Sequence, residues 1–286
     1  MPEPEITIAR SVAALRTAIA EWRGRGERIG LVPTMGAIHA GHLALVAAAR
    51  AQGMRVVATL FVNPKQFGPR EDFTAYPRDE TADIAAFHRA GVDLAFIPPV
   101  EEMYAPGFAT TVQVAGVSEP LEGAHRSGHF EGVATVVAKL LIQALPDAAF
   151  FGEKDYQQLT VVRRLARDLD IPVRIEGVPT VREPDGLALS SRNVYLSPEE
   201  RRIAPLLHRV LVDAAIALAQ RPDAVDAPVR RGISELQRAG FRVDYLELRD
   251  ADTLAPVTRL AGPARLLVAA HLGRTRLIDN VPVVPR

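Results

Sequence analysis

Two histidines, His39 and His42, stand beside Gly36 and Gly41, directly after an apolar run. Such imidazoles can ligate a metal, donate to phosphate oxygens, or cap and pack a helix. A metal site needs further ligands, and no carboxylate or cysteine cluster supports one in this stretch. Phosphate binding fits best, because glycines let backbone amides approach an anion at a helix N-terminus. The stretch matches neither a G-x-G-x-x-G fingerprint nor a Walker A loop.

A second phosphate-binding candidate lies at residues 187–193. Ser190, Ser191 and Arg192 place two hydroxyls and a guanidinium in succession, which suits phosphate oxygens. The stretch follows a strand-like segment that ends at Val181 and a turn over residues 183–186. A helix cap or a solvated loop is the alternative interpretation.

Residues 151–158 follow a predicted strand and open a predicted helix. Lys154 can neutralise a phosphate, and Asp155 can bind a ribose hydroxyl or a magnesium-bound water. Gln158 lies one turn after Lys154 and can face the same cleft. An ordinary helix start is the alternative, because the helix dipole favours Glu153 and Asp155 there.

Polar residues follow a further predicted strand at residues 61–67, where Gln66 comes after an Asn-Pro pair. A primary amide both donates and accepts, which suits a small substrate with hydroxyl and carboxylate groups. A turn is the alternative. The glycine-rich, charged stretch over residues 121–133, which includes Arg126, predicts a mobile loop before a helix.

Short apolar runs that alternate with helical segments must position these residues. Strands are predicted at residues 29–33, 56–62, 93–97, 148–151 and 173–178, and helices at 43–52, 81–90, 133–144 and 156–169. This alternation indicates a parallel α/β sheet. The candidate residues then lie where strands end and helices begin, which is where open α/β sheets bind ligands.

The pattern changes after about residue 180. Ser197 caps a predicted long helix that reaches about residue 219, and a second helix covers residues 227–239. Strands at residues 243–248, 266–270 and 275–279 predict a small antiparallel sheet. We therefore expect a boundary near residue 180, with an α/β domain over residues 1–180 and a smaller α+β domain over residues 181–286.

Composition narrows the class of protein. The 286 residues include 34 basic and 34 acidic side chains and no cysteine. The charge balance argues against binding to nucleic acid or to a membrane surface through bulk charge. The absence of cysteine excludes disulfides and thiolate metal sites. The N-terminus has no signal-peptide pattern, and no apolar run looks long enough to cross a bilayer. We expect a soluble cytoplasmic protein.

The four motif stretches together resemble a known family. His39-Ala-Gly-His42 resembles the His-x-Gly-His motif of nucleotidyltransferases related to class I aminoacyl-tRNA synthetases. With residues 61–67, 150–158 and 189–193 in order, and tail motifs at 243–249 and 275–280, the chain resembles the pantoate–β-alanine ligase (pantothenate synthetase) family over nearly its whole length. One mild departure is Leu189, where many members carry methionine.

The resemblance implies a Rossmann-like domain over residues 1–180 that binds the nucleotide and pantoate, and a smaller α+β lid domain over residues 181–286. It also implies an ATP-dependent reaction in a homodimer. Pantoate and β-alanine would condense through pantoyl adenylate to give pantothenate, AMP and diphosphate, with Mg²⁺ accompanying ATP. The implied catalytic residues are His42, the position of the proton donor, His39, Lys154 and Arg192. The implied ATP-binding set is Met35, Gly36, His39, Gly41, His42, Gly152, Glu153, Lys154, Asp155, Val181, Leu189, Ser190, Ser191 and Arg192.

The same resemblance assigns pantoate to Gln66 and Gln158, with Gln66 also contacting β-alanine. Arg126 lies in a loop that varies within the family, so its role stays open. The residues indicate neither metal ligands nor a base for the β-alanine amine.

Three other classes of protein share some of these features. Another adenylyltransferase would keep the histidine motif without needing both Gln66 and Gln158. A metal-dependent hydrolase would need acidic or histidine ligands on neighbouring strand ends. A non-catalytic nucleotide-binding regulator would bind ATP without releasing diphosphate. The residues alone, without the resemblance, support only an α/β protein with a phosphate site of the kind that binds a nucleotide.

Overall fold

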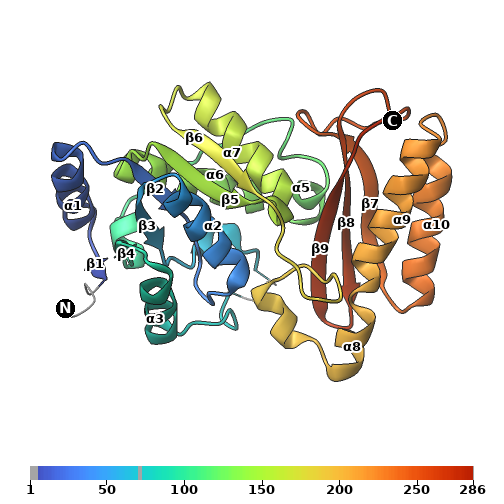
Figure 1. Cartoon of the computed structure of the whole chain (residues 1–286), viewed down its shortest axis with the longest axis horizontal. Coiled ribbons are helices and arrows are strands. Elements are labelled where there is room, and N and C mark those ends of the chain that lie inside the picture. The colour runs from blue at the N-terminus through green and yellow to red at the C-terminus, as the bar shows by residue number, and fades with distance from the viewer. Residues whose placement is uncertain (1–5, 70–72, 286) are drawn as a thin grey trace. The chain divides into compact units, whose positions relative to one another are not determined.

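A computed structural model describes residues 6–69 and 73–285 of the chain (Figure 1). The extreme N-terminus, on which the expected lack of a signal sequence depends, falls partly outside this range. The chain forms two compact units. The first comprises Met1–Ala115, Arg126–Glu153 and Val161–Pro179, and the second comprises Gly116–His125, Lys154–Thr160 and Thr180–Arg286. The predicted division at residue 180 did not include the two short segments that cluster with the second unit.

The first unit contains a six-stranded parallel sheet with the order β1-β4-β3-β2-β5-β6. Its central strands are short apolar runs buried on both faces, as expected for a parallel sheet. The parallel sheet predicted from the sequence is therefore confirmed. The strands are β1 (Thr7–Ala9), β2 (Ile29–Val32), β3 (Arg55–Thr59), β4 (Leu94–Phe96), β5 (Ala148–Gly152) and β6 (Arg174–Val178).

Helices connect these strands, and α3 shows how the sequence sets the bounds of one of them. Asp79 caps α3 by accepting a hydrogen bond from the Ala82 N–H, and Gly91 ends α3 in the left-handed conformation. Val46 of α2 and Phe87 of α3 pack into one core cluster with strand residues from the same face of the sheet. The helices are α1 (Val12–Gly24), α2 (Ala40–Ala51), α3 (Glu80–Ala90), α4 (Val100–Met103), α6 (His129–Ala144) and α7 (Tyr156–Asp168).

The strand order places the candidate residues of the first unit on one edge of this sheet. Strand β2 lies between β3 and β5, so the chain leaves β2 toward one side and later returns on the other. The carboxyl ends of these three strands lie side by side, and each leads into one of the predicted motifs. An open α/β sheet binds ligands at such a reversal of strand order.

The second unit is built on an antiparallel sheet with the order β7-β8-β9, as predicted. Leu207, Leu211 and Leu236 from its two long helices pack with Leu266 and Val268 in one core cluster. The elements are α5 (Glu122–His125), α8 (Pro198–Ile203), α9 (Leu206–Gln220), α10 (Asp226–Arg238), β7 (Arg242–Asp250), β8 (Ala264–Leu272) and β9 (Thr275–Val283).

The long helix predicted after Ser197 is interrupted. Ser197 and Glu200 form the expected capping box, but α8 ends at Ile203 and α9 begins after Pro205. The stretch Pro198–Gln220 has 23 residues, and its most apolar 18-residue window has a mean hydropathy of 1.4, so by length and composition it is apolar enough to span a membrane. The expectation that no segment reaches this length and hydropathy was therefore wrong. A third of its most apolar window, 33%, is buried, and α9 packs on the antiparallel sheet as a core helix does.

Candidate active site

His39 and His42 lie at the start of α2 with their rings 4.1 Å apart between centroids. Nδ1 of His39 accepts a hydrogen bond from the Gly41 N–H at 3.1 Å, and Nδ1 of His42 accepts from the His39 N–H at 3.4 Å. A neutral imidazole that accepts at Nδ1 carries its proton on Nε2. Both rings can therefore cap the helix through one nitrogen and donate to an anion through the other.

The loop before this helix is held by Asp83, a buried residue of α3 that the sequence analysis did not identify. Its carboxylate accepts hydrogen bonds from the Ala37 N–H at 3.0 Å and the Ile38 N–H at 2.8 Å. Ala37 has a left-handed backbone with φ of 51°, and Gly36 has φ of 88°. A Cβ on Gly36 would lie 2.8 Å from Asp83 Oδ2, so glycine is needed at this close approach.

Gln66 ends the short 3-10 helix η1 (Pro64–Gln66) after β3, and its side-chain amide has a fixed orientation. Asn63 Nδ2 donates to Gln66 Oε1 at 3.0 Å, and Gln66 Nε2 donates to Met35 Sδ at 3.0 Å. Tyr104 in turn donates from its hydroxyl to Asn63 Oδ1 at 2.7 Å. Burial raises the pKa of Tyr104 well above its ordinary value, so the hydroxyl remains a donor at neutral pH.

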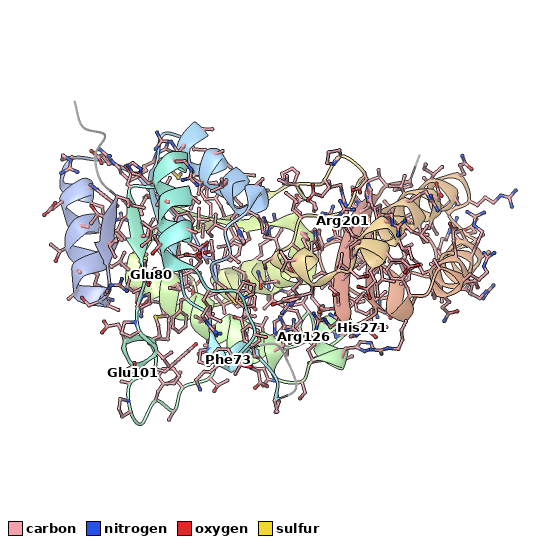
Figure 2. The ribbon with its side chains drawn as sticks, turned by 90° about the horizontal axis from the view of Figure 1, so that it is seen from below. Phe73, Glu80, Glu101, Arg126, Arg201 and His271 are labelled. Atoms are coloured by element: carbon pink, nitrogen blue, oxygen red, sulfur yellow. The ribbon has the colours of Figure 1, made fainter. Side chains whose placement is uncertain are left out.

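The backbone of Gln66 is fixed from the start of α6. Arg126, labelled in Figure 2, donates from Nη1 to His129 Nε2 at 3.0 Å. This contact leaves the proton of a neutral His129 on Nδ1, which donates to the Gln66 carbonyl at 2.8 Å. Helix α6 also lies very close to η1, because a Cβ on Gly132 would be 2.2 Å from the Lys65 carbonyl oxygen. Arg126 thus contacts the predicted substrate residue indirectly.

Gly152 and Glu153 complete the candidates of the first unit. Gly152 is the last residue of β5, and Glu153 begins the 3-10 helix η2 (Glu153–Asp155). A Cβ added to Gly152 would meet no heavy atom within 4 Å, so the backbone is open on that side. A ligand can approach the main chain there.

Lys154, Asp155 and Gln158 belong to the second unit. Lys154 Nζ lies 3.7 Å from Asp155 Oδ2, and the Lys154 side chain is 18% exposed. The neighbouring Gln157 is buried and structural, because it accepts from the Glu122 N–H and donates to the Val117 and Pro120 carbonyls. Gln158, the predicted substrate residue, is only partly buried.

The hydroxyl-rich loop is carried by a small hairpin over residues 181–189. The Leu189 N–H donates to the Val181 carbonyl at 3.0 Å, and Arg182 and Ala188 form an antiparallel bridge. Ser190 then caps the 3-10 helix η3 (Ser191–Tyr195) by accepting from the Arg192 N–H at 3.3 Å. The Ser190 oxygen therefore caps this helix as an acceptor, and its hydroxyl can still donate to a phosphate oxygen.

The predicted residues thus form two sets. The first unit contains the candidates within residues 35–66, together with Gly152 and Glu153. The second unit contains Lys154, Asp155, Gln158 and the candidates within residues 181–192. Residues 6–69 and 73–285 contain no group of three or more His, Cys, Asp or Glu side chains able to hold a metal ion.

Known proteins match this chain over nearly its whole length. A family model described as pantoate–β-alanine ligase matches residues 7–282. A pantothenate synthetase from Paramagnetospirillum magneticum is 60% identical over 98% of this chain and 99% of its own length. A pantothenate synthetase from Caulobacter vibrioides is 57% identical, over 96% of this chain and 98% of its own length.

Solved structures of pantothenate synthetases have folds similar to that of this chain. The crystal structure of pantothenate synthetase from Thermus thermophilus has a TM-score of 0.92 and 52% identity, covering 98% of this chain and 100% of that one. The ligase from Francisella tularensis, in complex with β,γ-ATP and β-alanine, has a TM-score of 0.81 and 31% identity. The match covers 96% of this chain and 97% of that one.

Proposed function

Because the chain belongs to the pantoate–β-alanine ligase family and is an ATP-dependent ligase, we propose that it forms pantothenate through pantoyl adenylate. The pantoate carboxylate attacks the α-phosphorus of ATP, the bond to the β-phosphate breaks, and diphosphate leaves. The β-alanine amine then attacks the acyl carbon, loses a proton and expels AMP. A carboxylate is already ionised at neutral pH, so the first step requires no base.

His39 and His42 carry the proposal for the first unit. Their Nδ1 atoms accept backbone hydrogen bonds, which leaves Nε2–H as the donor toward phosphate oxygens. Positioned donors of this kind stabilise the charge that develops as diphosphate leaves. His42, at the family's proton-donor position, can pass a proton to the departing oxygen.

The second unit supplies the cationic groups. We assign Lys154 to charge on the α-phosphate, and Ser190, Ser191 and Arg192 to the β- and γ-phosphates. The adenosine would contact Gly152, Asp155 and the Val181 backbone. The Val181 carbonyl already accepts from the Leu189 N–H, so its remaining lone pair and its own N–H are the groups left for adenine.

Gln66 and Gln158 are assigned to pantoate. The oriented amide of Gln66 keeps its oxygen on Asn63, so Nε2 is its donor toward a substrate oxygen. The Francisella relative binds β-alanine, and we place the same substrate near Gln66. No described side chain is assigned as the base for the amine.

Magnesium enters this proposal with its nucleotide. Mg²⁺ retains several waters and is commonly held by substrate phosphates plus one or two carboxylates. The described part of the chain has no cluster of three acidic or histidine side chains, which fits a cation carried by ATP. Asp155 is the candidate to hold one of its waters.

We also propose a cytoplasmic homodimer that binds neither nucleic acid nor membranes. The formal net charge of zero supports the absence of bulk electrostatic binding. Light scattering tests the assembly: a mass of two chains is expected, and a mass of one chain would contradict it.

Exchange of labelled diphosphate into ATP tests the chemistry. The exchange should depend on pantoate and should occur without β-alanine, because the first step is reversible. Lys154→Ala should lower its rate by about two to three orders of magnitude. Exchange without pantoate would point to another acid, and wild-type exchange by folded Lys154→Ala would remove that residue from the step.

A further inference from the structure

Two neighbouring residues near the C-terminus, Asp279 and Asn280 of β9, are both buried, with 4% and 3% of their surfaces exposed. Adjacent residues of a strand point to opposite faces of the sheet. Asp279 pairs with Val268, a core residue on the face that α9 covers, and Asn280 pairs with Leu267 on the other face. Polar side chains this deeply buried require specific partners.

Asn280 holds the main chain at Lys154. Its Nδ2 donates to the Lys154 carbonyl at 2.9 Å. Its Oδ1 accepts from Arg265 Nε at 2.7 Å, which fixes the orientation of the amide. The Arg265 guanidinium stacks 4.1 Å from the ring centroid of Tyr156, two residues after Lys154. The turn that carries Lys154 is therefore held at two points from the sheet.

Asp279 holds the hairpin that carries the Ser-Ser-Arg loop. Its two oxygens accept from Arg182 Nη1 at 2.7 Å and from Nη2 at 2.9 Å, a bidentate geometry. The same guanidinium donates to the Gly186 carbonyl at 3.1 Å, across the turn of the hairpin. Asp279 Oδ1 also accepts from the Asn280 N–H at 2.7 Å, which joins the two contacts.

We propose that Asp279 and Asn280 are positioning residues for ATP. Asp279 acts through Arg182 to hold the loop assigned to the β- and γ-phosphates. Asn280 acts through the main chain of Lys154 to hold the turn assigned to the α-phosphate. The inference rests on the proposed function of Lys154 and of Ser190–Arg192. Each contact has a distinct kinetic effect: the Asn280 contact governs the rate of adenylation, and the Asp279 contact governs the affinity for ATP.

Asn280→Asp tests the first contact. The variant keeps the size of the side chain and the acceptor for Arg265 but loses the donor toward the Lys154 carbonyl. Pantoate-dependent ATP–diphosphate exchange should slow by about 10- to 100-fold at saturating ATP. Thr275→Val is the matched control, because Thr275 is equally buried on β9 and its hydroxyl has no hydrogen-bond partner in the described chain. Control and wild type should exchange equally fast.

A double mutant separates positioning from general damage. If Asn280 acts through Lys154, adding Asn280→Asp to Lys154→Ala should slow exchange by less than about twofold further. The inference would be overturned if Asn280→Asp slowed exchange in the Lys154→Ala background as much as it does in the wild type. Wild-type exchange by folded Asn280→Asp would also overturn it. Asn280→Ser is the second variant if the aspartate does not fold. Lack of exchange in the wild type would instead overturn the proposed function.

Asp279→Asn tests the second contact. The amide retains one acceptor for Arg182 but loses the charge and the bidentate geometry. KM for ATP should rise by about 10-fold with a smaller change in kcat, since the loop binds phosphates in both ground and transition states. A fall in kcat with an unchanged KM for ATP would overturn this assignment.

Discussion

Asn63 Nδ2 donates a hydrogen bond of 3.0 Å to Gln66 Oε1, so the Gln66 amide presents its nitrogen rather than its oxygen to a substrate. Asn63 cannot turn over easily, because its Oδ1 accepts from Tyr104 and the Lys65 N–H while its Nδ2 also donates to the Gly132 carbonyl. Gln66 therefore offers a donor. A substrate oxygen such as that of a carboxylate or hydroxyl satisfies it.

Tyr104→Phe should weaken this arrangement while leaving the fold intact. The change removes one neutral hydrogen bond to Asn63, which is worth about 0.5–1.5 kcal/mol. KM for pantoate should rise by about 2- to 12-fold, with little change in KM for ATP, in steady-state kinetics. Tyr245→Phe is the control, because it removes a hydroxyl contact to Glu122 in the other unit. Equal KM changes in both variants would contradict the role of Tyr104.

Asp83→Ala should disable the loop that precedes the histidines. The variant leaves the Ala37 and Ile38 N–H groups without their acceptor and the left-handed backbone at Ala37 without its restraint. We expect ATP–diphosphate exchange to slow by about 10- to 100-fold. Glu80→Gln on the same helix is the control, because Glu80 pairs with Arg10 at an exposed position and such pairs contribute little. Unchanged exchange by folded Asp83→Ala would refute the role.

Gly132→Ala should separate α6 from η1. The new methyl would lie 2.2 Å from the Lys65 carbonyl oxygen and 2.6 Å from the Gln66 Cα, so backbone must move. The free energy of unfolding, measured by thermal denaturation, should fall by about 1–3 kcal/mol, and KM for pantoate should rise. Gly24→Ala in α1 should instead be neutral or stabilising by up to about 1 kcal/mol, because a Cβ there meets nothing within 4 Å. Equal stability of the two variants would contradict this account.

The parallel sheet could be predicted because its strands are continuous apolar runs with helices of ordinary length between them. Strand β1 could not, since it has three residues, forms the sheet edge and leaves Ile8 43% exposed. The start of α2 was predicted three residues late, because histidine is an unusual cap and its role depends on the Gly41 N–H.

Residues of the candidate site could be predicted where they lie close together in the sequence, as in His39-Ala-Gly-His42. Residues that act across long sequence separations were not. Asp83 lies 46 positions from Ala37, and Asn280 lies 126 positions from Lys154. The sequence pattern around neither residue indicates its partner. The segments 116–125 and 154–160 join the second unit through contacts of the same kind, such as Tyr245 with Glu122 and Tyr156 with the Ala251 carbonyl.

His271, labelled in Figure 2, gives the second unit a pH-dependent stability. Burial lowers the pKa of His271 below its ordinary value of 6.5, and the opposing attraction of Asp244, 3.4 Å from Nε2, does not reverse this. Arg242 and Arg276 also face the ring and lower its pKa further. The folded chain therefore favours the neutral ring, and the unfolded chain binds the proton more readily.

The sign of the effect follows from that difference in protons bound. The stability that the neutral ring contributes is present above pH 6.5 and is lost as the pH falls through 6.5 toward the lower pKa of the folded state. His271→Gln cannot titrate, so its melting temperature should fall less than that of the wild type between about pH 7.5 and about pH 5.5. His88→Gln, in the first unit, controls for the loss of a histidine. An equal fall in His271→Gln and the wild type would show that this ring does not contribute to acid sensitivity.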